Sequence, residues 1–327
     1  MQGSQHRIIG ALFVMGNVAG IQEAQAQVQI PPPIVAISGE WVPSAGVELP
    51  EEVEDLVPEA DREIELPIFA ATVNVPIRLS DRAVLVPGAR YGVLIPSDSG
   101  TVVDLDDPAF HTVGAQVLFS YQFNSSWSML LQLAPSLAGD FANFDGDHFR
   151  LAATGLVAYR FSERLEVGGG LAATYRFGGL LPVPVLAIEW RISESVRLDA
   201  VLPAILNLIW QPHNRFELGI AGSVIGQSFA ITSDNVQELP ACSAEDDELL
   251  PEEDLCFDRL AFSRGEIGPV AGVRLFKSVW FSVRASFLFL RRYEFLNADN
   301  ETPPFGDLSV DRTVSVLSSI QWRIPNT

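Results

Sequence analysis

The sequence has very little lysine. One lysine stands against 20 arginines in 327 residues, so the Lys- and Glu-rich solvent face of an ordinary soluble protein is missing. The formal net charge of −20 argues against a nucleic-acid partner, because nucleic-acid binding needs a basic surface. No run of 18 apolar residues occurs, so the sequence offers no transmembrane helix.

The motifs of common enzyme classes are missing as well. The segment 222–226 has the wrong spacing for a nucleophile elbow, and no Gly-Lys-Ser/Thr phosphate loop occurs. None of the four histidines is followed by serine, which argues against the serine–histidine arrangement of a barrel phospholipase. We therefore expect no catalytic residue, no cofactor and no metal site.

The first 26 residues have the pattern of an export signal. His6 and Arg7 supply a weakly basic start, residues 8–21 are mainly apolar, and Ala24-Gln25-Ala26 is a small-x-small cleavage site. We expect a cleaved signal peptide over 1–26 and a mature chain that begins near Gln27. An uncleaved N-terminal anchor is the alternative, although the apolar stretch is short for a bilayer-spanning helix.

Acidic residues are concentrated in a few segments. Of the 41 carboxylates, 32 lie in residues 40–65 and in four later loops, 95–109, 139–148, 231–258 and 294–311. Because charge repulsion and proline oppose burial, we expect a disordered, acidic, Pro-rich leader over 27–65. A lumen plug or a partner-docking tail is the alternative for this leader.

Cysteine is limited to Cys242 and Cys256, which bracket the most acidic loop. Export to an oxidising compartment favours a disulfide between them. Two free thiols or an intermolecular bridge are weaker alternatives. A metal site is weaker still, because no histidine lies nearby.

Five short turns have almost the same sequence pattern. In each, an aromatic or basic residue leads into a few polar residues, and an apolar, alternating run restarts at once. Such turns close antiparallel hairpins. A sixth turn of the same kind covers 77–83. The five turns are 121–127, 159–165, 190–196, 210–216 and 274–280.

The runs between the turns alternate apolar and polar residues with a period of two. In 112–123, for example, Val113, Val117 and Phe119 alternate with Gln116 and Ser120. The polar face is rich in small residues and arginine, and aromatic residues gather at the run ends, as in a membrane-interface girdle. Short turns at one end and long acidic loops at the other predict an all-β, antiparallel transmembrane β-barrel over 66–327.

The number of strands is less clear from the pattern. Thirteen candidate strands can be placed, of which the first covers 66–79, whereas bacterial barrels usually have an even number. We therefore expect about 12 strands, within a range of 10 to 14. The candidates are 66–79, 84–94, 109–123, 127–138, 148–161, 164–177, 183–192, 196–202, 205–211, 216–230, 259–275, 279–293 and 309–324.

The middle of the chain resembles an uncharacterised bacterial outer-membrane β-barrel family, a domain of unknown function. The resemblance is carried by 150–164, 182–190, 193–198, 201–203 and 210–212, and extends over about 70–324. It implies a membrane barrel of a Gram-negative outer membrane and no catalytic residue. Outer-membrane barrels usually end in an aromatic residue, whereas here Trp322 is followed by five more residues.

The alternation places several charges on the predicted lumen face. An interlocked ion-pair core that closes a narrow barrel is the favoured interpretation, and a polar conduit lined by fixed charge is the alternative. The charges are Arg160, Glu166, Arg176, Arg197, Asp199, Glu217, Arg274, Arg284 and Arg323.

The main functional hypothesis is a non-enzymatic, porin-like outer-membrane barrel with a narrow-pore or structural role. A barrel hydrolase that uses Asp106, Asp107, Asp145, Asp147 and His148 at the outer rim is one alternative, and residues 143–147 could also be half of a calcium loop. A surface binding or assembly protein, with specificity in loops 231–258 and 294–308, is the other.

The expected partners are outer-membrane lipid, lipopolysaccharide and the barrel-assembly machinery; the sequence leaves the oligomeric state open. The 22 carboxylates of the four later loops predict a negative mouth that attracts cations, whereas lumen arginine opposes their passage. We therefore expect small or no conductance, with a preference for cations.

Overall fold

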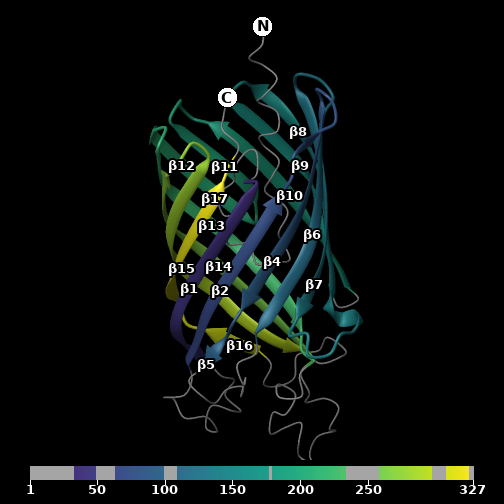
Figure 1. Ribbon diagram of the computed structural model, residues 1–327, viewed down its shortest axis with the longest axis vertical. Helices are drawn as coiled ribbons and strands as arrows, with labels where there is room; N and C mark the ends of the chain where they lie inside the picture. The colour runs from purple at the N-terminus through teal and green to yellow at the C-terminus, as the bar shows by residue number, and fades with distance from the viewer. Residues whose placement is uncertain are drawn as a thin grey trace, which may run out of the picture.

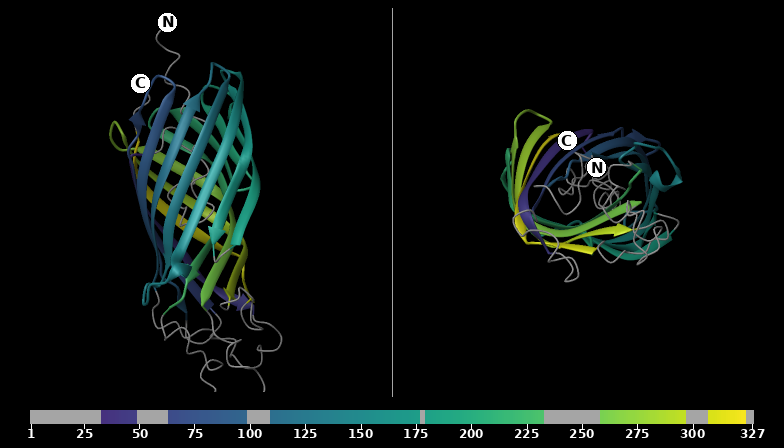
Figure 2. Two further views of the ribbon diagram at one scale, coloured as in Figure 1. Left: turned by 90° about the vertical axis from the view of Figure 1, so that its right-hand side faces the viewer. Right: turned by 90° about the horizontal axis from the view of Figure 1, so that it is seen from below.

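The chain forms a closed antiparallel β-barrel (Figure 1). The computed structural model describes residues 33–48, 63–98, 109–176, 179–232, 258–296 and 307–323. The barrel closes because the first strand, β1 (Val35–Glu48), pairs with β2 (Glu63–Asn74) on one side and with the last strand, β17 (Thr313–Trp322), on the other. Figure 2 shows the ring from its long-loop end.

Fourteen strands make up the wall, and three short segments extend them. Consecutive long strands are neighbours all the way round. The other strands of the wall are β4 (Ala83–Leu94), β6 (Phe110–Gln122), β7 (Trp127–Gly139), β8 (Phe149–Ser162), β9 (Leu165–Arg176), β10 (Gly179–Arg191), β11 (Val196–Leu202), β12 (Ile205–His213), β13 (Phe216–Ala230), β14 (Arg259–Arg274) and β15 (Val279–Leu296). The extensions are β3 (Ile77–Arg78), β5 (Ser97–Asp98) and β16 (Asp307–Val310).

The count of strands resolves the odd number left by the sequence. All thirteen predicted strands are present, and β1 is the fourteenth. The prediction of a disordered leader over 27–65 is therefore wrong for 35–48 and for the start of β2. Pairing with both neighbours satisfies the backbone groups of this acidic segment, and the alternation Ala36, Ser38, Glu40 places its buried residues on the lumen face. The predicted signal peptide lies outside the described residues.

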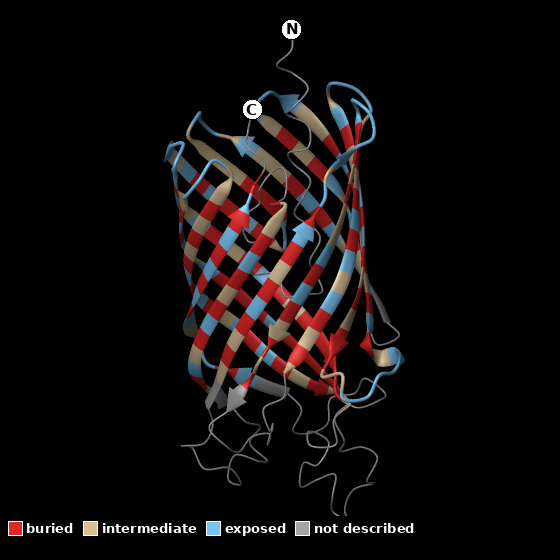
Figure 3. Cartoon of the chain, viewed as in Figure 1, coloured by how far each residue is buried: buried red, intermediate tan, exposed pale blue. Residues whose placement is uncertain are grey.

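The two faces of the wall carry the residues that the period predicts (Figure 3). In β6, Val113 and Val117 are exposed on the outer face, whereas Gln116 and Ser120 are buried on the lumen face. The outer face is mainly apolar. At the short-turn end it carries exposed aromatic side chains, including Trp127, Trp190, Trp210 and Trp322. An apolar band with an aromatic rim is the surface that a lipid bilayer requires.

Side-chain caps fix the repeated short turns. The amide of Asn124 supplies an oxygen that accepts hydrogen bonds from the backbone N–H groups of Ser126 and Trp127, at 2.8 and 2.9 Å. The hydroxyl of Ser162 does the same for Arg164 and Leu165. The recurrence of Asn or Ser at the start of the turn is therefore explained by local hydrogen bonding.

The long-loop end is pinched across the ring. β7 and β13 are six strands apart in the wall, yet Ala230 forms a parallel bridge with Gly139. The Asp140 carboxylate accepts hydrogen bonds from the backbone N–H of Thr232 at 2.8 Å and from its hydroxyl at 2.6 Å. We call this contact, made by Gly139, Asp140, Ala230 and Thr232, the mouth clasp.

The long-loop end of the β13–β14 hairpin leaves the wall to make this clasp. Residues 227–230 of β13 and 259–262 of β14 are buried on both faces, unlike wall residues, which alternate. On the other side of the hairpin, a one-residue bulge between β14 and β15 coincides with the positive φ of Leu290. A bulge bends a strand and shifts which residues face inward. Leu288 therefore faces the lumen on the short-turn side of the bulge, and Tyr293 faces it on the long-loop side.

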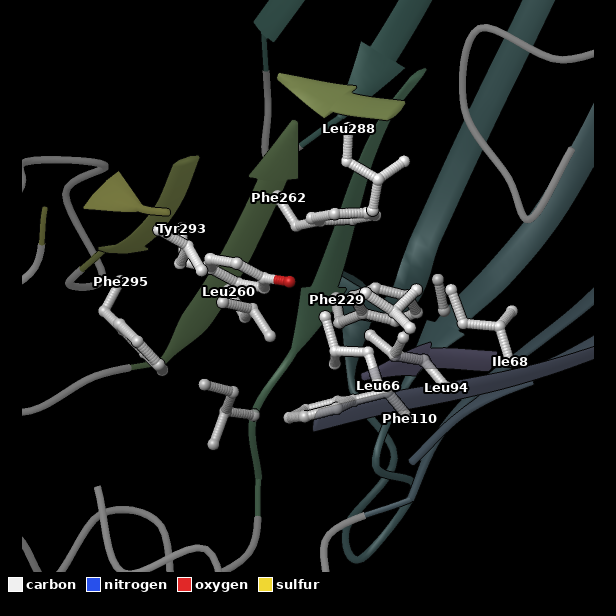
Figure 4. Close-up of a cluster of buried hydrophobic side chains, with 14 of the residues drawn as sticks. Leu66, Ile68, Leu94, Phe110, Phe229, Leu260, Phe262, Leu288, Tyr293 and Phe295 are labelled. Atoms are coloured by element: carbon white, nitrogen blue, oxygen red, sulfur yellow. The ribbon is translucent and has the colours of Figure 1, made fainter. Parts of the chain in front are cut away.

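Apolar side chains fill the lumen behind the clasp. Figure 4 shows Phe110 and Phe229 against Leu66 and Leu94, with Phe262 beside Leu288 and Tyr293 beside Leu260, from strands that are far apart in the wall. The rings of Phe110 and Phe229 lie 5.2 Å apart, and those of Phe262 and Tyr293 5.3 Å apart. We call this set of buried residues the apolar cluster. Among the described residues, no helix is long and apolar enough to cross a membrane.

Candidate functional site in the barrel lumen

Most of the predicted lumen charges form a belt of ion pairs at the short-turn end. Arg160 Nη2 lies 2.7 Å from Glu166 Oε2, and their residues are partners in the β8–β9 ladder. Arg197 Nε lies 3.2 Å from Asp199 Oδ2. Arg323 Nη1 donates a hydrogen bond to Glu217 Oε2 at 3.0 Å. Only the first of these pairs joins neighbouring strands: Arg197 and Asp199 are both on β11, and Arg323, directly after β17, reaches Glu217 of β13 past the two strands between them.

Two members of this belt, Glu189 and Arg191, are not among the predicted lumen charges. Glu189 of β10 pairs in register with Glu166 on one side and with Asp199 on the other. Arg191 Nη2 lies 3.6 Å from its Oε1 atom. Adding Glu189 and Arg191 gives four carboxylates and four guanidinium groups, so the belt is balanced in formal charge.

Three of the predicted lumen arginines lie elsewhere. Arg274 places its guanidinium carbon 5.9 Å from the ring centre of Trp280 rather than in the belt. Arg284 belongs to a second network nearer the middle of the barrel. Arg176 is in β9, but its side chain is outside the described residues.

The second network is a chain of four buried charges, Glu40–Arg264–Glu266–Arg284, which we call the lumen chain. Arg264 Nη2 lies 2.5 Å from Glu40 Oε2 and 3.6 Å from Glu266 Oε2. Arg284 Nη2 lies 2.5 Å from Glu266 Oε1, which also accepts a hydrogen bond from the Ser223 hydroxyl. All four charged side chains are at most 3% exposed.

The lumen chain crosses the inside of the barrel. Glu40 is on β1 and Arg264 on β14, and β17 and β15 lie between them in the wall. Three strand steps correspond to about 14 Å along a sheet, so the two side chains reach each other over the lumen face of the intervening strands. The chain therefore occupies space that an open pore would leave to water.

Part of the lumen chain could have been found in the sequence. Arg264 and Glu266 are alternate residues of a predicted strand in which Ile267 faces outward, so the period places both of them inside. Glu40 could not be found in this way, because its segment was assigned to the disordered leader. Its partner on β14 is 224 residues away in sequence.

The rim residues proposed for hydrolysis have structural roles. The His148 ring is buried between Phe141 and Phe144, with ring centres 5.0 and 5.3 Å away. Its Nδ1 atom lies 2.8 Å from Asp145 Oδ1, within the capping box of a three-residue helical turn, Gly146–His148. Asp147 is held at 2.5 Å by Arg259. These contacts fasten the β7–β8 loop to the long-loop end of the β13–β14 hairpin.

Several predicted site residues lie outside the described part of the chain. Asp106 and Asp107 are among them, so their distance from His148 is not defined. The Cys242–Cys256 disulfide stays a prediction for the same reason, as do roles for most of loops 231–258 and 294–308. Within the described ranges, no three His, Cys, Asp or Glu side chains are grouped as a metal ion would require.

One family model matches part of the chain. Residues 105–242 match the family model described as "Domain of unknown function (DUF6268)", so the expected resemblance to an uncharacterised domain is confirmed for this part of the chain. None of the curated proteins matches the chain.

Three solved structures are similar to most of the chain. An outer membrane channel from Pseudomonas putida F1 is 8% identical with a TM-score of 0.45, and the match covers 92% of this chain and 99% of that one. The TodX monoaromatic hydrocarbon channel, as a deltaS2S3 mutant, is 10% identical with a TM-score of 0.43, and the match covers 90% of this chain and 91% of that one. LpxR from Salmonella typhimurium is 9% identical with a TM-score of 0.35, and the match covers 89% of this chain and 99% of that one. Likeness at this level does not extend to function.

Proposed function

We propose that this protein is an outer-membrane β-barrel that admits small solutes through a narrow passage and carries out no chemistry itself. The observation that carries the proposal is the lumen chain, which bridges β1 and β14 across the inside of the barrel. A wide pore needs a water-filled lumen, whereas here charged side chains bind one another below the apolar cluster. The apolar outer face supports the location in a membrane.

The size of the passage can be tested by liposome swelling. Purified full-length protein in liposomes is expected to admit arabinose slowly and to exclude raffinose, because side chains narrow the lumen. Rapid entry of raffinose would contradict the narrow passage. No entry of arabinose above empty liposomes would leave a structural barrel in place of a pore.

The absence of catalysis is tested separately. Purified protein is expected to hydrolyse neither peptides nor phospholipids, because His148 is enclosed by its own loop. Hydrolysis that is lost in both Asp107→Ala and His148→Ala would establish a rim enzyme instead. Because His148→Ala also weakens the loop, heat-modifiable gel migration should first show that both variants are folded.

A further inference from the structure

The hydrogen-bonded wall is interrupted between the tip of the β11–β12 hairpin and the long-loop end of the barrel. β11 pairs with β10 as far as Leu202 opposite Leu186, and β12 pairs with β13 as far as Ile205 opposite Ser223. Among the described residues, 179–185 of β10 pair only with β9. Residues 225–230 of β13 pair with β14 and touch β7 through Ala230. We call the interval between these two segments the ladder gap.

The foot of the ladder gap lies at the height of the bilayer core. Trp190 and Trp210 mark the aromatic rim at the short-turn end. The last β10–β11 pair is at Leu186, and the last β12–β13 pair is at Ile205, only four and five residues from these tryptophans. At the rise and tilt of barrel strands this is roughly 10–12 Å, about half of an apolar band of about 25 Å.

The tip of the hairpin has the composition of a segment in lipid. The six residues 201–206, Val-Leu-Pro-Ala-Ile-Leu, contain no polar side chain, whereas every other loop at this end is acidic except the short β9–β10 connection, Phe177-Gly178. Leu202 and Leu206 are exposed on the outer face. A tip that ended in water would be expected to carry polar turn residues, so its composition agrees with the height given by the strand lengths.

The edge of β10 at the gap is protected against pairing with another strand. Pro182 and Pro184 are alternate residues, so their nitrogens point to the same edge. Proline in a sheet places its nitrogen on an unpaired edge, because it has no N–H to donate. Two donors are therefore removed where β11 is missing, and an added β-strand from a partner would find a poor template.

The lumen side of the gap is apolar at its foot. Val185, Val201 and Ile205 belong to one buried apolar set with Leu156 of β8 and Ala172 of β9. The ion-pair belt lies nearer the short turns, and the lumen chain is on β1, β14 and β15. A molecule that entered the lumen beside β8–β10 would therefore meet aliphatic side chains next to the gap.

Beyond the tip of the β11–β12 hairpin, β13 bends inward, away from β10. Above Val224, which is exposed on the outer face, β13 leaves the wall and crosses to β7. Its Ser228 then accepts a hydrogen bond from Arg150 Nε of β8 at 3.0 Å, inside the ring. Near the long-loop end, β13 thus lies between the apolar cluster, which includes its Phe229, and the lumen face of β8.

We infer that small apolar molecules leave the lumen sideways, through the ladder gap, into the outer half of the bilayer. The inference rests on the proposed function of a narrow passage and adds its route and the class of its solute. An apolar molecule gains free energy by moving from water to the aliphatic wall and then to lipid. The unpaired backbone of the gap lines a passage, which is where irregular backbone is tolerated at membrane depth.

The route is tested by filling the gap. Gly226 lies on β13 beside the gap, and a Cβ there would have its nearest neighbour at 4.0 Å, so a larger side chain can be accommodated. Gly155 of β8 is the matched control, because its Cβ would also be uncrowded, at 3.6 Å from Leu131, and lies on the outer wall away from the gap. The variants are Gly226→Phe, Gly226→Leu and Gly155→Phe.

The probe is N-phenyl-1-naphthylamine, an apolar dye that fluoresces in lipid and is slowed by an intact outer membrane. Cells with wild-type protein and with Gly155→Phe are expected to take up the dye severalfold faster than cells without the protein. Gly226→Phe is expected to remove most of this increase, and Gly226→Leu part of it. Heat-modifiable migration verifies that each variant is a folded barrel.

The outcomes separate this inference from the proposed function. Dye uptake that the protein does not accelerate, with arabinose still entering liposomes, would overturn the sideways route alone. Failure of both dye and arabinose would overturn the narrow passage too. Equal loss of dye and arabinose entry in Gly226→Phe would show an axial path shared by both solutes, and would also overturn the sideways route.

Discussion

Near the short turns and the middle of the barrel, the lumen carries the paired charges of the belt and of the lumen chain, whereas behind the mouth clasp its side chains are aromatic and aliphatic. The first region is held by bonds such as Arg160–Glu166 and Arg284–Glu266, between named atoms at 2.5–3.0 Å. The second is held by packing of residues such as Phe110 and Phe229. The lumen is thus closed by directional, charge-assisted hydrogen bonds at one level and by non-directional apolar burial at another.

This difference predicts how each region fails. Removing one partner of a buried ion pair leaves a charge without compensation. Removing a methyl group from a packed cluster leaves only a small cavity. The variants below are ordered from the largest expected effect to the smallest.

Glu266→Ala should have the largest effect. It removes the carboxylate that binds both Arg264 and Arg284, and loss of one partner of a buried pair costs about 3–5 kcal/mol. The free energy of unfolding, measured with urea in detergent, is the readout. The exposed pair Arg78–Asp81 is the control, because Asp81→Ala should cost less than about 1 kcal/mol.

The double variant Glu266→Ala with Arg284→Ala sharpens the test. Since the second substitution removes a guanidinium that has lost its carboxylate, the double variant should be more stable than the sum of the single effects predicts. Additive losses would mean that the pair contributes no coupling to the lumen chain.

Gly139→Ala should weaken the mouth clasp by about 1–3 kcal/mol, the usual cost of overpacking. A Cβ at Gly139 would lie 2.6 Å from the His148 ring and 2.8 Å from the Ala230 carbonyl oxygen. Gly146→Ala in the same loop is the control, because nothing lies within 4 Å of its Cβ. Conductance in planar bilayers should rise in the first variant and not in the second; equal behaviour would contradict the clasp.

Ile68→Val should have the smallest effect, about 0.5–1.5 kcal/mol, because it removes one methylene from the apolar cluster. The loss should be the same in low and in high salt, since no charge is involved. A loss that depends on salt concentration would show that the apolar cluster and the lumen chain are not independent.

The sequence was sufficient for most of the wall, because a period of two and a repeated turn are local signals. Ser162 and Asn124 cap their own turns, so those hairpins need no information from elsewhere. β1 was missed because its glutamates and neighbouring prolines resemble a disordered segment. Its burial comes from β17, which lies at the other end of the chain.

The closure of the lumen was harder to predict for the same reason. The belt was partly anticipated, since Arg160, Glu166, Asp199, Glu217 and Arg323 lie on the predicted face and bind their predicted kind of partner. The inward bend of β13 depends on how short β11 and β12 are and on its meeting with Gly139, six strands away. A contact between strands on opposite sides of a ring leaves no periodic trace in either one.

The most direct test of a lumen closed at two levels is a planar-bilayer recording of the wild-type protein. We expect small or no conductance. Any current should prefer cations, because the long loops carry 22 carboxylates, and this preference should weaken as salt screens the mouth. Large, anion-selective steps that are insensitive to salt would contradict the account.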